Sequence, residues 1–127
     1  MSKNNAVILE LDPQIAGSYE LFLAARGFSV TAASSLAAAT RALVAHPAEV
    51  LVIGNLPDTI DASTVAERMR AIVAPKPLVV IVLSPNMDAI GGADLVIPRG
   101  AHPRALVDAI RTTLRARPVT APLATAS

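Results

Sequence analysis

Five residues with chemically active side chains lie at or just after short apolar runs: Glu10, Asp12, Asp58, Ser84 and Arg99. Carboxylate oxygens are ligands of hard cations such as Mg²⁺, and a hydroxyl beside a guanidinium can hold an anion. Phosphoryl transfer needs such groups together, because its transition state must be surrounded by positive charge and donors. The neighbouring positions Leu11, Ile53 and Gly54 carry no such chemistry.

Alternating strand and helix patterns space these residues along the chain. The apolar runs are short and rich in Val, Ile and Leu, as in strands buried on both faces. They are Ala6–Leu11, Phe28–Ala32, Glu49–Ile53, Leu78–Leu83 and Asp94–Ile97. Strands that alternate with helices indicate a parallel sheet covered on both faces.

Four helical patterns separate or follow these runs. Asp12 before Pro13 predicts the start of the first helix, and Gly27 its end. The second pattern runs from about Ser35 to Ala45, the third starts near Asp61 and the last begins at Pro103. The residues expected to face inward are Ile15, Tyr19, Phe22, Leu23, Leu36, Ala39, Leu43, Val44, Val65, Met69, Ile72, Val73, Leu106, Val107, Ile110 and Leu114.

The connection between the fourth and fifth strands is unusually short. It extends from Ser84 to Ala93 and contains Pro85 and the pair Gly91-Gly92. Because a parallel crossover takes about 10–12 residues, at most one helical turn can form there. We therefore expect the fourth helix of the fold to be truncated or absent. Its loss would expose apolar side chains of an interaction face at Met87, Ile90, Leu95 and Ile97.

Length and composition favour one cytoplasmic domain. Residues 1–116 form the expected domain, and residues 117–127 read as a disordered tail or the start of a linker. Although 53% of the residues are hydrophobic, no apolar run reaches the roughly 18–20 residues of a membrane span. The first residues show no signal-peptide pattern, and the sequence has no cysteine, a net charge of +1 and only 2% aromatic residues. These features argue against membrane and nucleic-acid partners.

Three landmarks in order make the chain resemble the receiver domain of bacterial two-component response regulators, over roughly residues 5–116. They are Glu10-Leu11-Asp12-Pro13 followed by Gly27-Phe28-Ser29-Val30, then Glu49–Ile53 with Leu56-Pro57-Asp58, and finally Gly92-Ala93-Asp94 with Ile97-Pro98-Arg99. The resemblance implies an α/β fold: a flavodoxin-like three-layer αβα domain with a five-stranded parallel sheet in the order 2-1-3-4-5.

In that family two acidic residues hold Mg²⁺, an aspartate accepts the phosphoryl group, and a hydroxyl and a lysine contact the phosphate. Carried over by position, Glu10 is the first acid, but the second position is Leu11, with Asp12 one place later. The acceptor position falls on Ile53 or Gly54. The remaining two positions are Ser84 and Arg99. The resemblance therefore implies a degenerate site with no catalytic residue, and neither Mg²⁺ nor another cofactor is expected.

Several alternatives remain open at this edge. Asp58 could replace the missing acceptor, although the turn chemistry of Pro57-Asp58 explains it equally. Glu10 could be a Mg²⁺ ligand, or it could be a residue near a strand end whose side chain reaches water. Arg99 could pair with Glu10 or Asp58, or join Ser84 in holding an anion.

The last helix carries Arg104, Arg111 and Arg115 on one stripe that also contains Asp108. The stripe predicts either a solvated face with an i,i+4 ion pair or a contact with a partner or a second copy. His46 and His102 each precede a proline and are interpreted as cap or loop residues.

The favoured hypothesis is an atypical receiver domain, not an enzyme, that acts as a phosphorylation-independent protein-interaction or dimerisation module. Its expected partners are another protein or other domains of the same signalling protein. The alternatives are a receiver phosphorylated at Asp58, and a small-anion-binding flavodoxin-like module. The usual nucleotide, flavin and cobalamin motifs are absent from the sequence.

Overall fold

The computed structural model describes residues 4–56, 60–85 and 90–116. In chain order its elements are β1 (Asn4–Leu9), α1 (Pro13–Ala25), β2 (Phe28–Ala33), α2 (Leu36–Ala45), β3 (Val50–Ile53), α3 (Ala62–Val73), β4 (Val79–Ser84), β5 (Leu95–Pro98) and α4 (Pro103–Ala116). The expected alternation of strands and helices is confirmed, although β1 ends at Leu9, two residues earlier than its apolar run.

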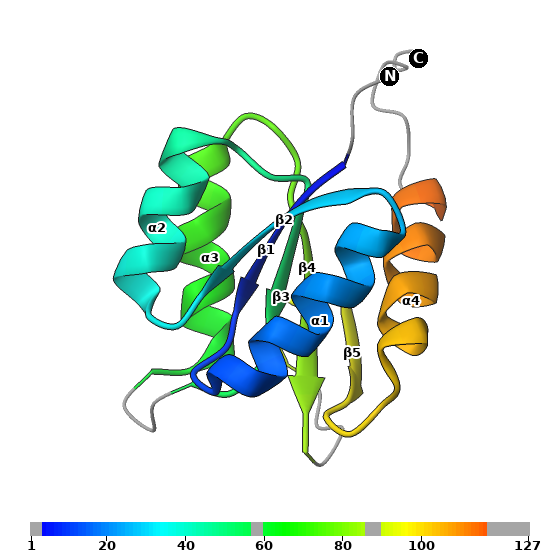
Figure 1. The fold of residues 1–127 in the computed structure, drawn as a ribbon. Helices are drawn as coiled ribbons and strands as arrows, with labels where there is room; N and C mark the ends of the chain where they lie inside the picture. The colour runs from blue at the N-terminus through cyan, green and yellow to red at the C-terminus, as the bar shows by residue number, and fades with distance from the viewer. Residues whose placement is uncertain (1–3, 57–59, 86–89, 117–127) are drawn as a thin grey trace.

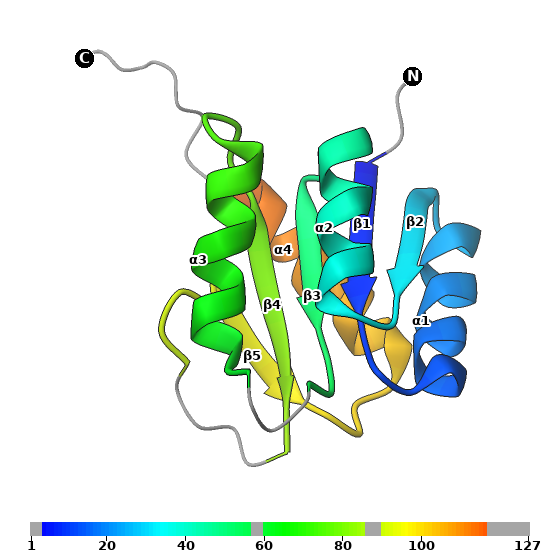
Figure 2. The same cartoon turned by 90° about the vertical axis from the view of Figure 1, so that its left-hand side faces the viewer.

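All strand pairs are parallel, and the sheet order β2-β1-β3-β4-β5 confirms the predicted order 2-1-3-4-5. Helices α2 and α3 cover one face of the sheet, and α1 and α4 cover the other (Figure 1). Turning the molecule by 90° shows β2 at one edge of the sheet and β5 at the other (Figure 2). The molecule therefore has the three layers of a flavodoxin-like fold.

The sheet divides the core into two apolar clusters. Because successive strand side chains point to opposite faces, β3 contributes Leu51 and Ile53 to the cluster under α2 and α3. It contributes Val50 and Val52 to the cluster under α1 and α4. All four side chains are fully buried, which explains why β3 reads as a continuous apolar run.

The helix ends follow local sequence signals. The Asp12 carboxylate accepts hydrogen bonds from the backbone N–H groups of Gln14 (2.9 Å) and Ile15 (3.4 Å), and Pro13 occupies the first turn. Gly27 follows α1 with a φ of 94°, as expected for the residue after a helix. The inward assignment of Val44 is wrong: its side chain is 66% exposed, and α2 buries Ala39 and Leu43.

Among the described residues, no helix lies between β4 and β5. Met87 lies outside the described residues. The expectation that the short connection exposes Leu95 and Ile97 is met only in part: both side chains are half-buried, and they point to the other face, where they pack on the cluster under α1 and α4. Strand alternation instead turns Val96 toward the face that carries α2 and α3.

Candidate functional site

The carboxyl ends of β1, β3, β4 and β5 bring several of the expected residues to one edge of the sheet. Leu9 pairs with Ile53 in the register of β1 and β3, so Glu10 and Gly54 follow side by side. Ser84 ends β4 opposite Pro98, and its carbonyl accepts the backbone N–H of Arg99 at 2.9 Å. Asp58 lies outside the described residues.

Glu10 is buried, with 1% of its surface exposed, so the interpretation that its side chain reaches water is wrong. Its Oε1 accepts the backbone N–H of Asn55 at 3.0 Å. Its Oε2 accepts the backbone N–H of Asp12 and the Asn55 side-chain amide, each at 2.9 Å. Hydrogen bonds to both oxygens compensate the burial of this carboxylate.

The Glu10 carboxylate lies directly over Gly54. A Cβ atom at position 54 would stand 2.0 Å from Glu10 Oε1 and 2.9 Å from its Cδ. Such distances are impossible without moving the carboxylate, so only glycine fits while Glu10 keeps its hydrogen bonds. Glu10 therefore fills the space into which a side chain at position 54 would project.

The other positions at the ends of β1 and β3 point elsewhere. Leu11 is 42% exposed, and the Asp12 carboxylate caps α1. Ile53 is fully buried in the core. Asn55, the chief partner of Glu10, was missed because nothing in its sequence neighbourhood indicates a bond to a residue 45 positions away.

Tyr19 connects this edge to the loop after β5. Its hydroxyl donates a hydrogen bond to the carbonyl of Ala101 at 3.3 Å. Burial, and secondarily the negative charge of Glu10, raises the pKa of the Tyr19 hydroxyl above 10.0. The folded protein therefore keeps the phenolic proton to a higher pH than an unperturbed tyrosine would.

Ser84 and Arg99 lie together on the wall of a hollow of about 300 Å³, which we call the strand-end hollow. Ser84 is buried, with 4% of its surface exposed. One terminal nitrogen of Arg99 is 3.5 Å from the carbonyl of Leu83, while its buried Nε has no hydrogen-bond partner among the described residues. The predicted ion pair between Arg99 and Glu10 does not form, because both Glu10 oxygens are directed to other donors.

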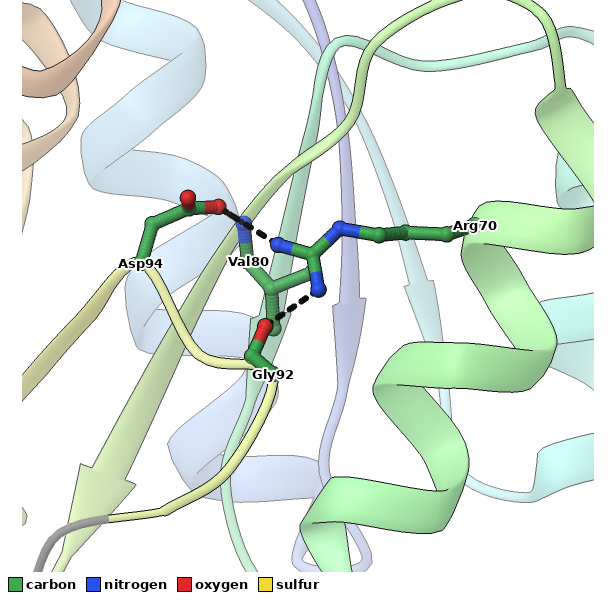
Figure 3. Close-up of polar contacts among 4 residues, drawn as sticks. All are labelled: Arg70, Val80, Gly92 and Asp94. Atoms are coloured by element: carbon green, nitrogen blue, oxygen red, sulfur yellow. Dashed lines mark hydrogen bonds and ion pairs between the residues drawn. The ribbon is translucent and has the colours of Figure 1, made fainter.

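An ion pair anchors the end of the connection between β4 and β5. Arg70 of α3 contacts Asp94 Oδ2 at 2.8 Å and donates a second hydrogen bond to the carbonyl of Gly92 (Figure 3). Asp94 Oδ2 also accepts the backbone N–H of Val80 at 2.7 Å. The chain segment before β5 is thus tied to both α3 and β4.

The arginine stripe of α4 is solvent-exposed at Arg104, Arg111 and Arg115. The predicted i,i+4 ion pair with Asp108 is absent, since Arg70–Asp94 is the ion pair within the described ranges. Arg111 instead donates to the carbonyl of Arg26 at the end of α1, at 3.2 Å. His46 caps α2 and His102 Nδ1 accepts the N–H of Arg104, which confirms both as cap residues.

In residues 4–56, 60–85 and 90–116, no group of three or more His, Cys, Asp or Glu side chains is placed to hold a metal ion. No helix within these ranges has the length and apolar character needed to cross a membrane.

No protein-family model and no curated protein matches the sequence. The fold is similar to many solved structures. A two-component response regulator from Clostridium difficile shares 13% identity over 90% of this chain and 98% of its own, with a TM-score of 0.77. A CheY-like receiver domain from Methylobacillus flagellatus shares 19% sequence identity over 88% of this chain and 99% of its own, with a TM-score of 0.76.

A third similar structure is the N-terminal domain of a response regulator/sensory box/GGDEF 3-domain protein from Carboxydothermus hydrogenoformans. It shares 17% identity over 88% of this chain and 94% of its own, with a TM-score of 0.72. With its five-stranded sheet in the order 2-1-3-4-5, this chain has the receiver-domain fold of two-component response regulators.

Proposed function

We propose that this domain is an atypical receiver that acts without phosphorylation, as a protein-interaction module in bacterial two-component-type signalling. The proposed setting is the cytoplasm. The partner is another protein or another domain of the same signalling protein, as the three-domain relative from Carboxydothermus hydrogenoformans illustrates.

The observation that carries this proposal is the contact between Glu10 and Gly54. An acceptor aspartate at position 54 would place its Cβ 2.0 Å from a carboxylate that three donors hold in place. Ile53, the other position matched to the acceptor, is buried in the core. Neither position offers a nucleophile for phosphoryl transfer.

The residues at the two acidic positions argue against Mg²⁺ binding. A Mg²⁺ site generally needs more than one oxygen-bearing side chain in near-octahedral geometry. Of the two acidic positions, Leu11 has no ligand atom in its side chain, and Asp12 caps α1. We therefore propose that the domain has no metal-dependent activity.

Incubation with Mg²⁺ and acetyl phosphate, followed by intact-mass measurement, tests the proposal. We expect no mass gain, and we expect Mg²⁺ with beryllofluoride to leave the amide NMR signals of Glu10, Gly54 and Ser84 unmoved. Uptake of a phosphoryl group would overturn the proposal. If Asp58→Ala then abolished the uptake, the alternative of phosphorylation at Asp58 would replace it.

We propose that the interaction face includes β5 and the arginine stripe of α4, on which a second copy could dock. Light scattering at increasing concentration tests this face. Dimerisation that Arg104→Ala and Arg115→Ala weaken, but the exposed control Arg41→Ala does not, would support it. A monomer at all concentrations would exclude a second copy and leave a different protein, or another domain of the same protein, as the partner.

A second candidate function is small-anion binding at Ser84 and Arg99, favoured by the unpartnered Nε of Arg99. Titration with inorganic phosphate, read from the amide signals of both residues, tests it. Binding in the wild type that is lost in Arg99→Gln would support this function.

A further inference from the structure

The strand-end hollow has largely apolar walls. Leu56 and Ile60 line it from the β3–α3 side, Val82 from β4, and Ile90 from the connection to β5. Leu56, Ile60 and Ile90 are half-buried, so part of their apolar surface still faces solvent. Covering that surface with an apolar side chain would be favourable, at about 25 cal/mol per Å².

Arg99 supplies a positive charge to the same hollow. Its buried Nε–H has no acceptor, and leaving a buried donor unsatisfied is costly. Within the described ranges no carboxylate forms an ion pair with Arg99, and Glu10 cannot do so without losing its own donors. A carboxylate from outside the domain would satisfy both the charge and the free donor.

A second hollow, of about 260 Å³, adjoins the first between α2 and α3. Ile60 lines both, and Leu36, Val65 and Arg68 line the second. Its one carboxylate, Asp61, is already the N-cap of α3, accepting the backbone N–H of Thr64 at 2.8 Å. Two adjoining apolar hollows, each with an arginine, suit an extended chain with several side chains better than a small free anion.

We propose that the strand-end hollow binds a segment of a partner protein in which a carboxylate neighbours a branched apolar side chain. The carboxylate pairs with Arg99, and the apolar side chain lies among Leu56, Ile60 and Ile90. This proposal rests on the proposed interaction function, and it names the chemistry of the partner. Gly54 lines the hollow without a side chain of its own, and its neighbour Glu10 is held by other donors, so the hollow beside them is available for docking.

Amide NMR titration of the domain with isocaproate, a branched apolar chain ending in a carboxylate, tests the proposal. We expect shifts at Leu56, Ile60, Ser84, Ile90 and Arg99. Isocaproamide, which lacks the charge, and acetate, which lacks the apolar chain, should each bind about tenfold more weakly.

Variants separate the charge of Arg99 from its packing. Arg99→Gln should weaken isocaproate binding about tenfold. Arg99→Lys should weaken it less, because the positive charge remains although the Nε donor is lost. Arg41→Gln, at an exposed position of α2, should leave binding unchanged. Urea unfolding of each variant checks that it remains folded. If Arg99→Gln fails to fold, the comparison of isocaproate with isocaproamide on the wild type decides by itself.

Three outcomes would overturn the proposal: no shift with isocaproate, equal binding of isocaproate and isocaproamide, or acetate and phosphate binding as tightly as isocaproate. The last would assign a small-anion site. Uptake of a phosphoryl group from acetyl phosphate would refute the phosphorylation-independent function but not the docking proposal. Arg99-dependent binding of isocaproate to the unphosphorylated domain would still support docking in the strand-end hollow.

Discussion

At the residue scale, one buried carboxylate organises the ends of β1 and β3. Glu10 accepts three hydrogen bonds, two of them from Asn55, which joins the loop after β3 to the end of β1. The carboxylate requires a glycine beside it, and Gly54 supplies one. Buried charges of this kind are tolerated only when hydrogen bonds satisfy them, so the whole arrangement depends on this fit.

Gly54→Ala should therefore destabilise the domain by about 2–4 kcal/mol, because the new Cβ displaces Glu10 and breaks its hydrogen bonds. The free energy of unfolding in urea measures the effect. Gly17→Ala is the matched control, since nothing lies within 4 Å of a Cβ at that helical position. Gly17→Ala should raise the free energy of unfolding by about 0.5–1 kcal/mol, because alanine favours the helix more than glycine does. Equal effects at the two glycines would contradict the role given to Glu10.

Tyr19 makes stability pH-dependent in the alkaline range. Its pKa is raised in the folded state, first by burial and then by Glu10, so the folded protein holds the phenolic proton more tightly than the unfolded chain. This contribution is fully present below the unfolded pKa of about 10 and is lost as the pH rises through the higher folded value.

Urea unfolding between about pH 8 and pH 11 should show a steeper loss of stability in the wild type than in Tyr19→Phe. Because Tyr19 is the single tyrosine and the chain has no tryptophan, tyrosinate absorbance follows its titration directly. Parallel pH profiles of the wild type and the variant would argue against the raised pKa.

At the element scale, the ion pair between Arg70 and Asp94 ties the start of β5 to α3. Asp94 contacts Arg70 of α3 and the backbone of Val80 in β4, immediately before β5 begins. Arg99 follows the end of β5 directly, so this anchor helps to fix where β5 delivers Arg99 to the strand-end hollow.

Asp94→Ala should cost about 1–3 kcal/mol, because it leaves the buried N–H of Val80 without its carboxylate acceptor. Arg70→Met should cost less, about 1 kcal/mol or below, since both partners of the ion pair are one-third exposed. Hydrogen exchange of the Val80 amide, together with urea unfolding, measures both effects. Asp108→Ala, on an exposed carboxylate without an ion pair, should change stability by no more than about 0.5 kcal/mol.

At the scale of the whole molecule, the two core clusters share the same strands. Met69 and Leu43 lie on one side of the sheet, and Tyr19 and Ile110 on the other. Because alternate residues of each strand enter opposite clusters, neither cluster can come apart while the other keeps its strands paired. The domain should therefore unfold in a single transition.

Met69→Ala tests this coupling, and we expect it to lower the free energy of unfolding by about 2–5 kcal/mol. Tyrosine fluorescence, which reports on the opposite cluster, should shift to the same lower urea midpoint as circular dichroism. Leu21→Ala, at a side chain 75% exposed on α1, should leave both midpoints nearly unchanged. A tyrosine transition that stayed in place in Met69→Ala would show two independent units.

Much of the fold was predictable because its signals are local. Apolar runs and helical spacing located the five strands and four helices, and Asp12 with Pro13 marked the start of α1. The length of the connection between β4 and β5 predicted that no full helix would form there, and none lies among its described residues. The inward assignment of Val44 failed because its apolar character is typical of a core residue, yet it lies on the exposed side of α2.

The sequence by itself determined the order of elements, their caps and the chemistry available at the strand ends, since these depend on residues a few positions apart. The tertiary structure decided how that chemistry is arranged. Glu10 meets Asn55 across 45 positions, and Leu95 and Ile97 face α4 because of the pairing of β5 with β4. Such contacts depend on strand register and on competition among donors, which only the folded chain brings together.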